Sequence, residues 1–113
     1  MNVLAFPEFP RPAVTVTLWQ EPQHLTLAEA QARLADQGYV AVKWRSEPHQ
    51  AYLPHAHIYT ELLWLVEGEL TVALTAERRL LELGPGDRME VPAGIVHALQ
   101  AGPEGAMYLA ATR

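Results

Sequence analysis

Apolar positions between residues 26 and 37 recur at the spacing of a helix. Leu27, Ala30 and Leu34 follow one another at intervals of three and four residues, which places them on one helical face. A helix of about three turns is marginally stable alone in water. We therefore expect this helix to pack its apolar face against a larger unit.

Residues at both ends of this segment favour a helix with these boundaries. Thr26 is a good N-cap, and Glu29, three residues later, is the partner that a capping box requires. Gly38 supplies the residue that adopts a left-handed conformation where a helix stops. The helix is thus expected over residues 26–37.

Short apolar runs separated by turn residues follow the helix to the end of the chain. Many are rich in β-branched and aromatic residues, which favour strands. We expect a hairpin turn at Glu67-Gly68 and another turn at Gly84-Pro85-Gly86-Asp87. Short strands at roughly even spacing predict an all-β sandwich or barrel. The expected strands cover residues 14–18, 39–45, 52–57, 61–66, 70–75, 79–83, 89–91, 97–100 and 106–112.

The length of 113 residues fits one domain, in which we expect two parts. Residues 1–37 would form an N-terminal arm, a strand and a helix that pack on a barrel formed by residues 38–113. Prolines interrupt residues 1–12 and favour an extended chain there. This segment lacks a basic leader, so we do not expect a signal peptide.

Composition limits the partners and the chemistry. The net charge of -5 argues against binding to nucleic acid or to anionic membranes, which attract basic surfaces. No apolar run approaches the ~20 residues of a membrane span, so we expect a soluble, cytoplasmic protein. Cysteine is absent, so a metal site must use histidine, carboxylate or backbone ligands.

Histidines are the candidate ligands. His55 and His57 stand two residues apart in an expected strand, so they would project from the same face. A bend after them would return Glu61 to that face. His97 follows a Pro-Ala-Gly turn, and pairing of its strand beside His55 would bring in a third imidazole.

Three imidazoles and one carboxylate suit one divalent transition metal, namely Fe, Mn, Ni, Zn, Co or Cu. They do not suit calcium, which takes six to eight oxygen ligands. Four protein ligands leave one or two positions open for water, dioxygen or a chelating substrate. The sequence identifies no separate catalytic residue.

The spacing around this histidine pair resembles the first conserved motif of the cupin superfamily. His55-x-His57 is followed by Glu61 after three residues and by Gly68 after six more. The motif usually opens with a glycine at the position that His49 occupies here. That position is not a metal ligand in the family.

The second cupin motif has a counterpart around the third histidine. Gly86 is followed after five residues by Pro92-x-Gly94, and His97 comes after two more. An asparagine often ends this motif where Ala101 stands here. Both motifs together cover residues 55–97, and the chain resembles small single-domain bacterial cupins.

This resemblance implies a cupin-type jelly-roll or conical β-barrel with the metal inside, often as a homodimer. Three functions then remain open. The first is a metal-dependent oxidoreductase, similar to a dioxygenase, that acts on a small molecule. The second is a non-redox, metal-dependent isomerase or lyase. The third is a non-enzymatic module that binds a small ligand, such as a sugar or an organic acid.

The three tryptophans have a structural interpretation as well. We expect Trp19, Trp44 and Trp64 to lie in the core or at a dimer interface rather than to form a substrate platform.

Overall fold

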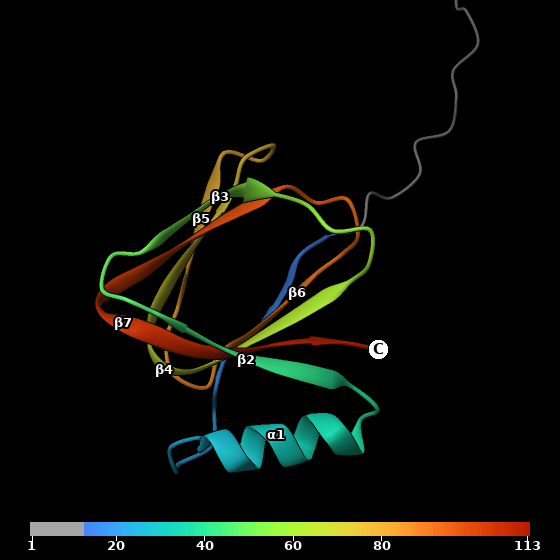
Figure 1. Ribbon diagram of the computed structural model, residues 1–113, viewed down its shortest axis with the longest axis vertical. Helices are drawn as coiled ribbons and strands as arrows, with labels where there is room; N and C mark the ends of the chain where they lie inside the picture. Colours follow the sequence, from blue (N-terminus) through green and yellow to red (C-terminus); the bar gives the residue numbers. More distant parts are fainter. Residues whose placement is uncertain (1–12) are drawn as a thin grey trace, which may run out of the picture.

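The computed structural model describes residues 13–113, and the expectations for residues 1–12 fall outside this part. Seven antiparallel strands curl into an open ring, with one helix outside it (Figure 1). The expected fold, an all-β barrel with one short N-terminal helix, is confirmed. The elements are β1 (Thr15–Thr17), α1 (Leu27–Asp36), β2 (Val40–Ser46), β3 (Ala51–His55), β4 (Glu61–Leu74), β5 (Arg79–Leu83), β6 (Arg88–Val91) and β7 (His97–Thr112).

Two long bent strands organise the sheet. The strand order is β1-β6-β4-β7-β2, while β3 also pairs with β7 and β5 with β4. Strands β4 and β7 pair along most of their lengths, from Leu62 opposite Ala111 to Leu74 opposite His97. Because β7 also pairs with β2 and β3, it connects most of the barrel.

The hairpin turn expected at Glu67-Gly68 is wrong, because β4 runs through this point without reversing. The register of β4 against β7 shifts on both sides of Gly68, so the strand bends there. Gly68 has a φ of 81°, and a Cβ at this position would collide with the carbonyl oxygen of Gly105. The glycine marks a strand corner, where two backbones approach closely. The two strands expected at residues 97–100 and 106–112 are likewise one strand, β7.

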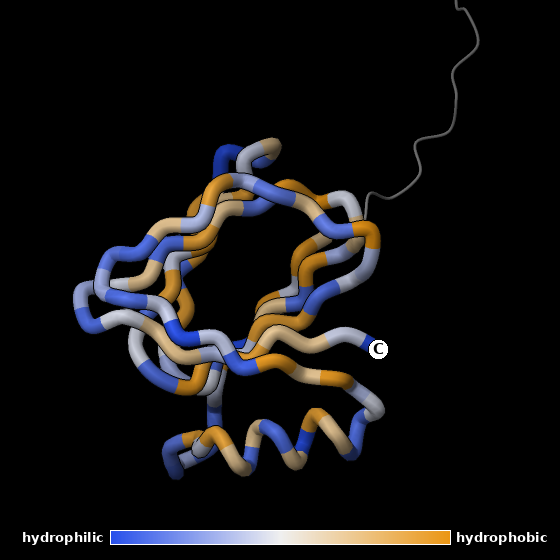
Figure 2. The backbone as a smooth tube through the Cα atoms, viewed as in Figure 1, coloured by the Kyte–Doolittle hydropathy of each residue, from blue (hydrophilic) through white to orange (hydrophobic). Residues whose placement is uncertain are grey.

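Both faces of the first half of β4 are buried, which explains its continuous apolar run. Leu63 and Leu65 belong to the core inside the ring. Leu62, Trp64 and Val66 alternate with them and pack on the other side with residues of α1. Figure 2 shows apolar positions along the strands of the ring and along part of the helix. Glu61 precedes Leu63 by two residues on the same strand, so its side chain is on the inward face.

The helix begins and ends as expected, but its capping box is only half formed. The backbone N–H of Glu29 donates to Oγ1 of Thr26 at 3.1 Å. The Glu29 carboxylate does not return to the cap. It accepts instead from the guanidinium of Arg33 at 2.6 Å. Gly38 follows with a φ of 82°, and buried Ala30 and Leu34 face the sheet.

Within residues 13–113, no helix combines the length and the apolar character that crossing a bilayer requires.

Candidate metal centre

Pairing of β3 with β7 brings the first and third histidines together. His55 ends β3 and lies directly opposite His97, the first residue of β7. Their ring centroids are 4.4 Å apart. The expected pairing of the His97 strand beside His55 is therefore confirmed.

His57 reaches the same place by a different route from the one expected. Strand β3 ends at His55, so His57 lies in the loop that follows and the two-residue strand argument does not apply to it. Its ring lies 5.0 Å from that of His55 and 5.7 Å from that of His97. The N–H of Gly94 donates to the carbonyl oxygen of His57 at 2.8 Å, which ties this loop to the turn before β7.

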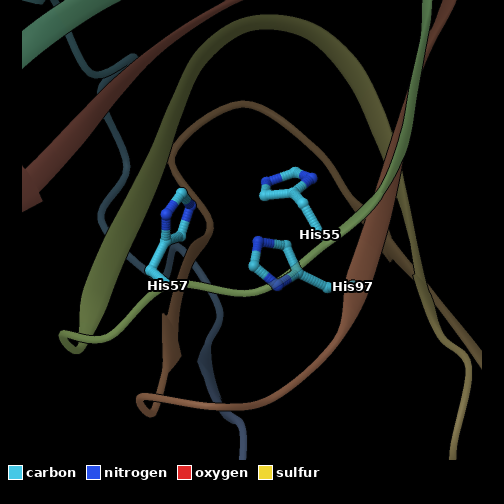
Figure 3. A group of neighbouring side chains, drawn as sticks. All are labelled: His55, His57 and His97. Atoms are coloured by element: carbon cyan, nitrogen blue, oxygen red, sulfur yellow. The ribbon is translucent and has the colours of Figure 1, made fainter.

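The three imidazoles form a compact group, the histidine cluster, comprising His55, His57 and His97 (Figure 3). One ligand nitrogen from each ring lies within 4.8 Å of the others. His97 is fully buried, whereas the other two are partly exposed. Among the three rings, only those of His55 and His57 are therefore reached by solvent.

Glu61, the first residue of β4, lies beside two of the three rings. Its Oε2 is 3.5 Å from Nε2 of His57, and its Oε1 is 3.9 Å from Nε2 of His97. The carboxylate therefore faces the cluster, as expected, although it is not part of the compact group of three.

Hydrogen bonds orient two of the rings with Nε2 inward. Nδ1 of His55 lies 2.9 Å from the carbonyl oxygen of Leu53, and Nδ1 of His97 lies 2.9 Å from that of Ile95. A carbonyl only accepts, so each Nδ1 donates, and neutral imidazole then has a lone pair on Nε2. Nε2 of His97 is buried without a hydrogen-bond partner. A buried bare nitrogen is costly unless something coordinates it, so the residues fit a metal ion.

Burial also keeps His97 in the form that binds metal. Desolvation lowers the pKa of His97, and the neighbouring His55 and His57 lower it further. The hydrogen bond to Ile95 and the negative charge of Glu61 oppose this shift. The net effect favours neutral imidazole, which is the ligand form.

A cavity of about 200 Å³ adjoins the cluster. Histidine and glutamate side chains, which are able to bind metal, form one part of its wall, and apolar and aromatic side chains form the rest. Such a mixture, with a few polar groups on an apolar wall, is typical of small-molecule sites. The lining residues are Trp44, Tyr52, His55, His57, Glu61, Leu63, Leu99, Tyr108 and Ala110.

Two aromatic residues of this wall were not predicted. Trp44 was expected in the core or at a dimer interface; it is 47% exposed, which excludes the core position, and it lines the cavity. Tyr108 was not singled out at all. Trp44 and Tyr108 are cross-strand partners in the β2–β7 ladder, so they share a face. Trp64, in contrast, is buried as expected and donates to the carbonyl oxygen of Gly86 at 2.8 Å.

Comparison with known families agrees with this geometry. The Cupin domain family matches residues 42–111, which include the whole histidine cluster. The chain therefore belongs to the cupin family. No curated protein is significantly similar to it in sequence.

Several solved structures have a similar fold. The polyketide cyclase RemF from Streptomyces resistomycificus is 25% identical with a TM-score of 0.60, and the match covers 66% of this chain and 53% of that one. This chain thus matches only about half the length of RemF. A cupin superfamily protein from Desulfitobacterium hafniense DCB-2 is 16% identical with a TM-score of 0.59, covering 93% and 81%. KdgF from Halomonas sp. is 26% identical with a TM-score of 0.54, covering 66% and 69%.

Proposed function

We propose that this protein is a metal-dependent cupin enzyme that acts on a small molecule held in the cavity beside the histidine cluster. One observation carries the proposal: three imidazoles converge, with Nε2 free in at least two of them, at the wall of a largely apolar cavity of about 200 Å³. A protein that only braced its barrel with a metal would not need a substrate-sized cavity at the same point.

In this proposal His55, His57 and His97 hold one divalent transition metal, and Glu61 is the fourth ligand. A metal in this site would supply Lewis-acid polarisation and, if redox-active, chemistry with dioxygen. The carbonyls of Leu53 and Ile95 hold two of the rings in position. The apolar wall binds the body of the substrate and excludes water around the reacting group.

The first reaction class that we propose is an oxygen-dependent oxidation of the substrate. Its support is the nitrogen-rich ligand set, which suits Fe, Mn, Ni or Cu as well as Zn. The test reconstitutes chelator-treated protein with each metal and screens small oxygen-bearing molecules in air. Stoichiometric metal together with turnover that stops without oxygen is the expected result. Uniform inactivity with a full site would argue for a binding module instead.

A second class is a non-redox conversion, such as a cyclisation, isomerisation or elimination. Its support is the similarity to the polyketide cyclase RemF and the position of Glu61, whose carboxylate lies 3.5 Å from Nε2 of His57. Released from the metal, this carboxylate could carry a proton. Turnover that persists under argon, and that Glu61→Gln abolishes without loss of metal, would select this class over the first.

Metal binding itself is tested with His57→Ala. This side chain lies in a loop, so its removal should leave the barrel folded while it abolishes tight binding. His24→Ala is the matched control, because His24 is exposed and lies outside the cluster. Elemental analysis of the two variants, purified without added metal, gives the comparison. Equal metal content would contradict the proposed ligand set.

A further inference from the structure

A second group of polar side chains meets the cavity away from the metal ligands. Oγ of Ser46, the last residue of β2, lies 2.9 Å from the hydroxyl of Tyr52 on β3. Tyr108 of β7 lines the same cavity as Tyr52. Ser46 stands behind this lining and reaches the cavity only through its contact with Tyr52. We call these three residues the hydroxyl cluster.

Two members of the hydroxyl cluster are buried, and the third, Tyr52, is partly buried. Ser46 and Tyr108 are only 3% and 4% exposed. Burial raises the pKa of Tyr108 to about 12. Tyr108 therefore presents a neutral O–H group, and each hydroxyl of the cluster is able both to donate and to accept a hydrogen bond. Hydroxyls inside an otherwise apolar cavity are costly unless they have partners.

The strand register separates this cluster from the histidines. Tyr52 lies opposite Leu99, two residues along β7 from His97. Tyr108 lies opposite Leu65, four residues along β4 from Glu61. At the ~3.3 Å rise of a strand, these offsets correspond to roughly 7 and 13 Å along the barrel. The cavity wall thus has the candidate metal ligands at one level along the barrel and the tyrosine hydroxyls at another.

Apolar side chains occupy the wall between these two levels. Leu63 and its cross-strand partner Ala110 line it there. Leu99 and Trp44, which lie opposite Tyr52 and Tyr108, complete the apolar and aromatic wall. Cavities of roughly 150 Å³ hold benzene, so the volume of about 200 Å³ suits one ring with small substituents.

We propose that the hydroxyl cluster binds the distal oxygen of a small hydroxylated aromatic molecule whose other oxygen-bearing end faces the histidine cluster. This assignment rests on the function proposed above and names its substrate class. Tyr52 and Tyr108 determine specificity in this assignment. Ser46 positions Tyr52 by hydrogen bonding to its hydroxyl. A buried hydroxyl pair discriminates strongly, because a ligand without the matching oxygen leaves it unpaired.

The test compares benzoate with 3- and 4-hydroxybenzoate, measured by calorimetry on zinc-loaded protein. All three carry one carboxylate that can face the metal. Each hydroxybenzoate differs from benzoate only by one ring hydroxyl. We expect at least one hydroxybenzoate to bind wild type about tenfold more tightly than benzoate, since one hydrogen bond has this magnitude. Tyr52→Phe and Tyr108→Phe should reduce that preference to within about threefold, with zinc content unchanged.

The control is Tyr39→Phe, which removes a tyrosine hydroxyl on the helix side of the sheet. Tyr39 packs with the apolar residues between the sheet and α1, and the guanidinium carbon of Arg113 lies 4.3 Å from its ring centroid. This variant should keep the preference of wild type. If benzoate binds wild type as tightly as both hydroxybenzoates, if none of the three binds, or if both cavity variants retain discrimination, the assignment is wrong.

A separate measurement distinguishes this failure from failure of the metal proposal. In chelator-treated protein, phenol and toluene are titrated while the ring signals of labelled tyrosines are followed by NMR. Phenol should shift the signals of Tyr52 and Tyr108 at concentrations where toluene does not. That result supports the hydroxyl cluster even if zinc fails to bind, and equal responses to the two probes overturn it.

Discussion

His55 and His97 are direct cross-strand partners, with ring centroids 4.4 Å apart, although they lie far apart in the sequence. The β3–β7 ladder places the two residues side by side. Their Nδ1 atoms both face backbone carbonyls, so two ligand-type nitrogens are oriented before any metal arrives. Such preorganisation lowers the cost of binding, because little side-chain freedom remains to be lost.

Metal binding should stabilise the folded protein strongly. Only the folded chain brings the three imidazoles together, so an ion at 100 times its dissociation constant adds about 2.7 kcal/mol. In thermal melts this corresponds to a rise on the order of 10 °C for a domain of this size. His97→Ala should lose the rise, whereas His24→Ala should keep it. An equal rise in both variants would show that the metal binds elsewhere.

Metal-free protein should lose stability in acid through His97. Because burial lowers the pKa of His97 in the folded state, the unfolded chain binds a proton there first as the pH falls through about 6.5. Stability from this group is therefore present above pH ~6.5 and is lost as the pH falls toward the lower folded-state pKa.

This contribution is measured by urea unfolding of chelator-treated wild type and His97→Gln between pH 8 and pH 5. The difference in unfolding free energy between the two should change across that range. A constant difference would mean that His97 titrates alike in both states.

Tyr108 should produce the opposite behaviour in alkali. Burial raises the pKa of Tyr108 to about 12, while an unfolded tyrosine titrates near 10. The folded chain keeps the proton longer, so stability from this group is present below pH ~10 and is lost as the pH rises to 12. The loss is about 2–3 kcal/mol, from roughly two pKa units.

Tyr108→Phe should remove this alkaline loss, and Tyr39→Phe should not. Denaturant midpoints at pH 9, 10 and 11 compare the three proteins. The same slope in wild type and Tyr108→Phe would contradict a buried phenol at this position.

The corner in β4 should be more sensitive to substitution than the end of the helix. Gly38 and Gly68 have nearly equal φ values of 82° and 81°, so the backbone strain of an added Cβ is alike. Only at Gly68 would the Cβ also strike the backbone of Gly105, whereas at Gly38 it meets open space. Gly38→Ala should cost about 1–2 kcal/mol.

Gly68→Ala should cost at least about 1–3 kcal/mol more, the range for overpacked sites. Chemical denaturation of the two variants gives the difference. Equal losses of stability would show that the β4–β7 corner adjusts freely, and that a glycine is needed at position 68 only for its positive φ.

The helix and the strand content were predictable because they depend on local patterns. Leu27, Ala30 and Leu34 repeat at helical spacing, and Thr26 and Gly38 are capping residues whatever the rest of the chain does. The hairpin turn predicted at Gly68 is wrong, because the glycine bends one continuous strand there. Whether a glycine closes a hairpin or bends one strand depends on the strand beside it, here β7 with Gly105.

The candidate ligands followed from residue type and spacing, whereas their arrangement did not. His57 lies beyond the end of β3, and the Gly94–His57 hydrogen bond, rather than strand alternation, holds its loop near the cluster. Trp44 and Tyr108 became part of the site only through the β2–β7 register.

The sequence by itself therefore determined the helix, the predominance of strands and the fold family, and it predicted four candidate metal ligands, since these depend on local propensity and on motif spacing. Only the tertiary structure decided which side chains share the cavity with them. That outcome depends on long-range register, in which a shift of one residue turns every side chain of a strand to the opposite face. The pairing of Trp44 with Tyr108 and the meeting of Ser46 with Tyr52 are consequences of that register.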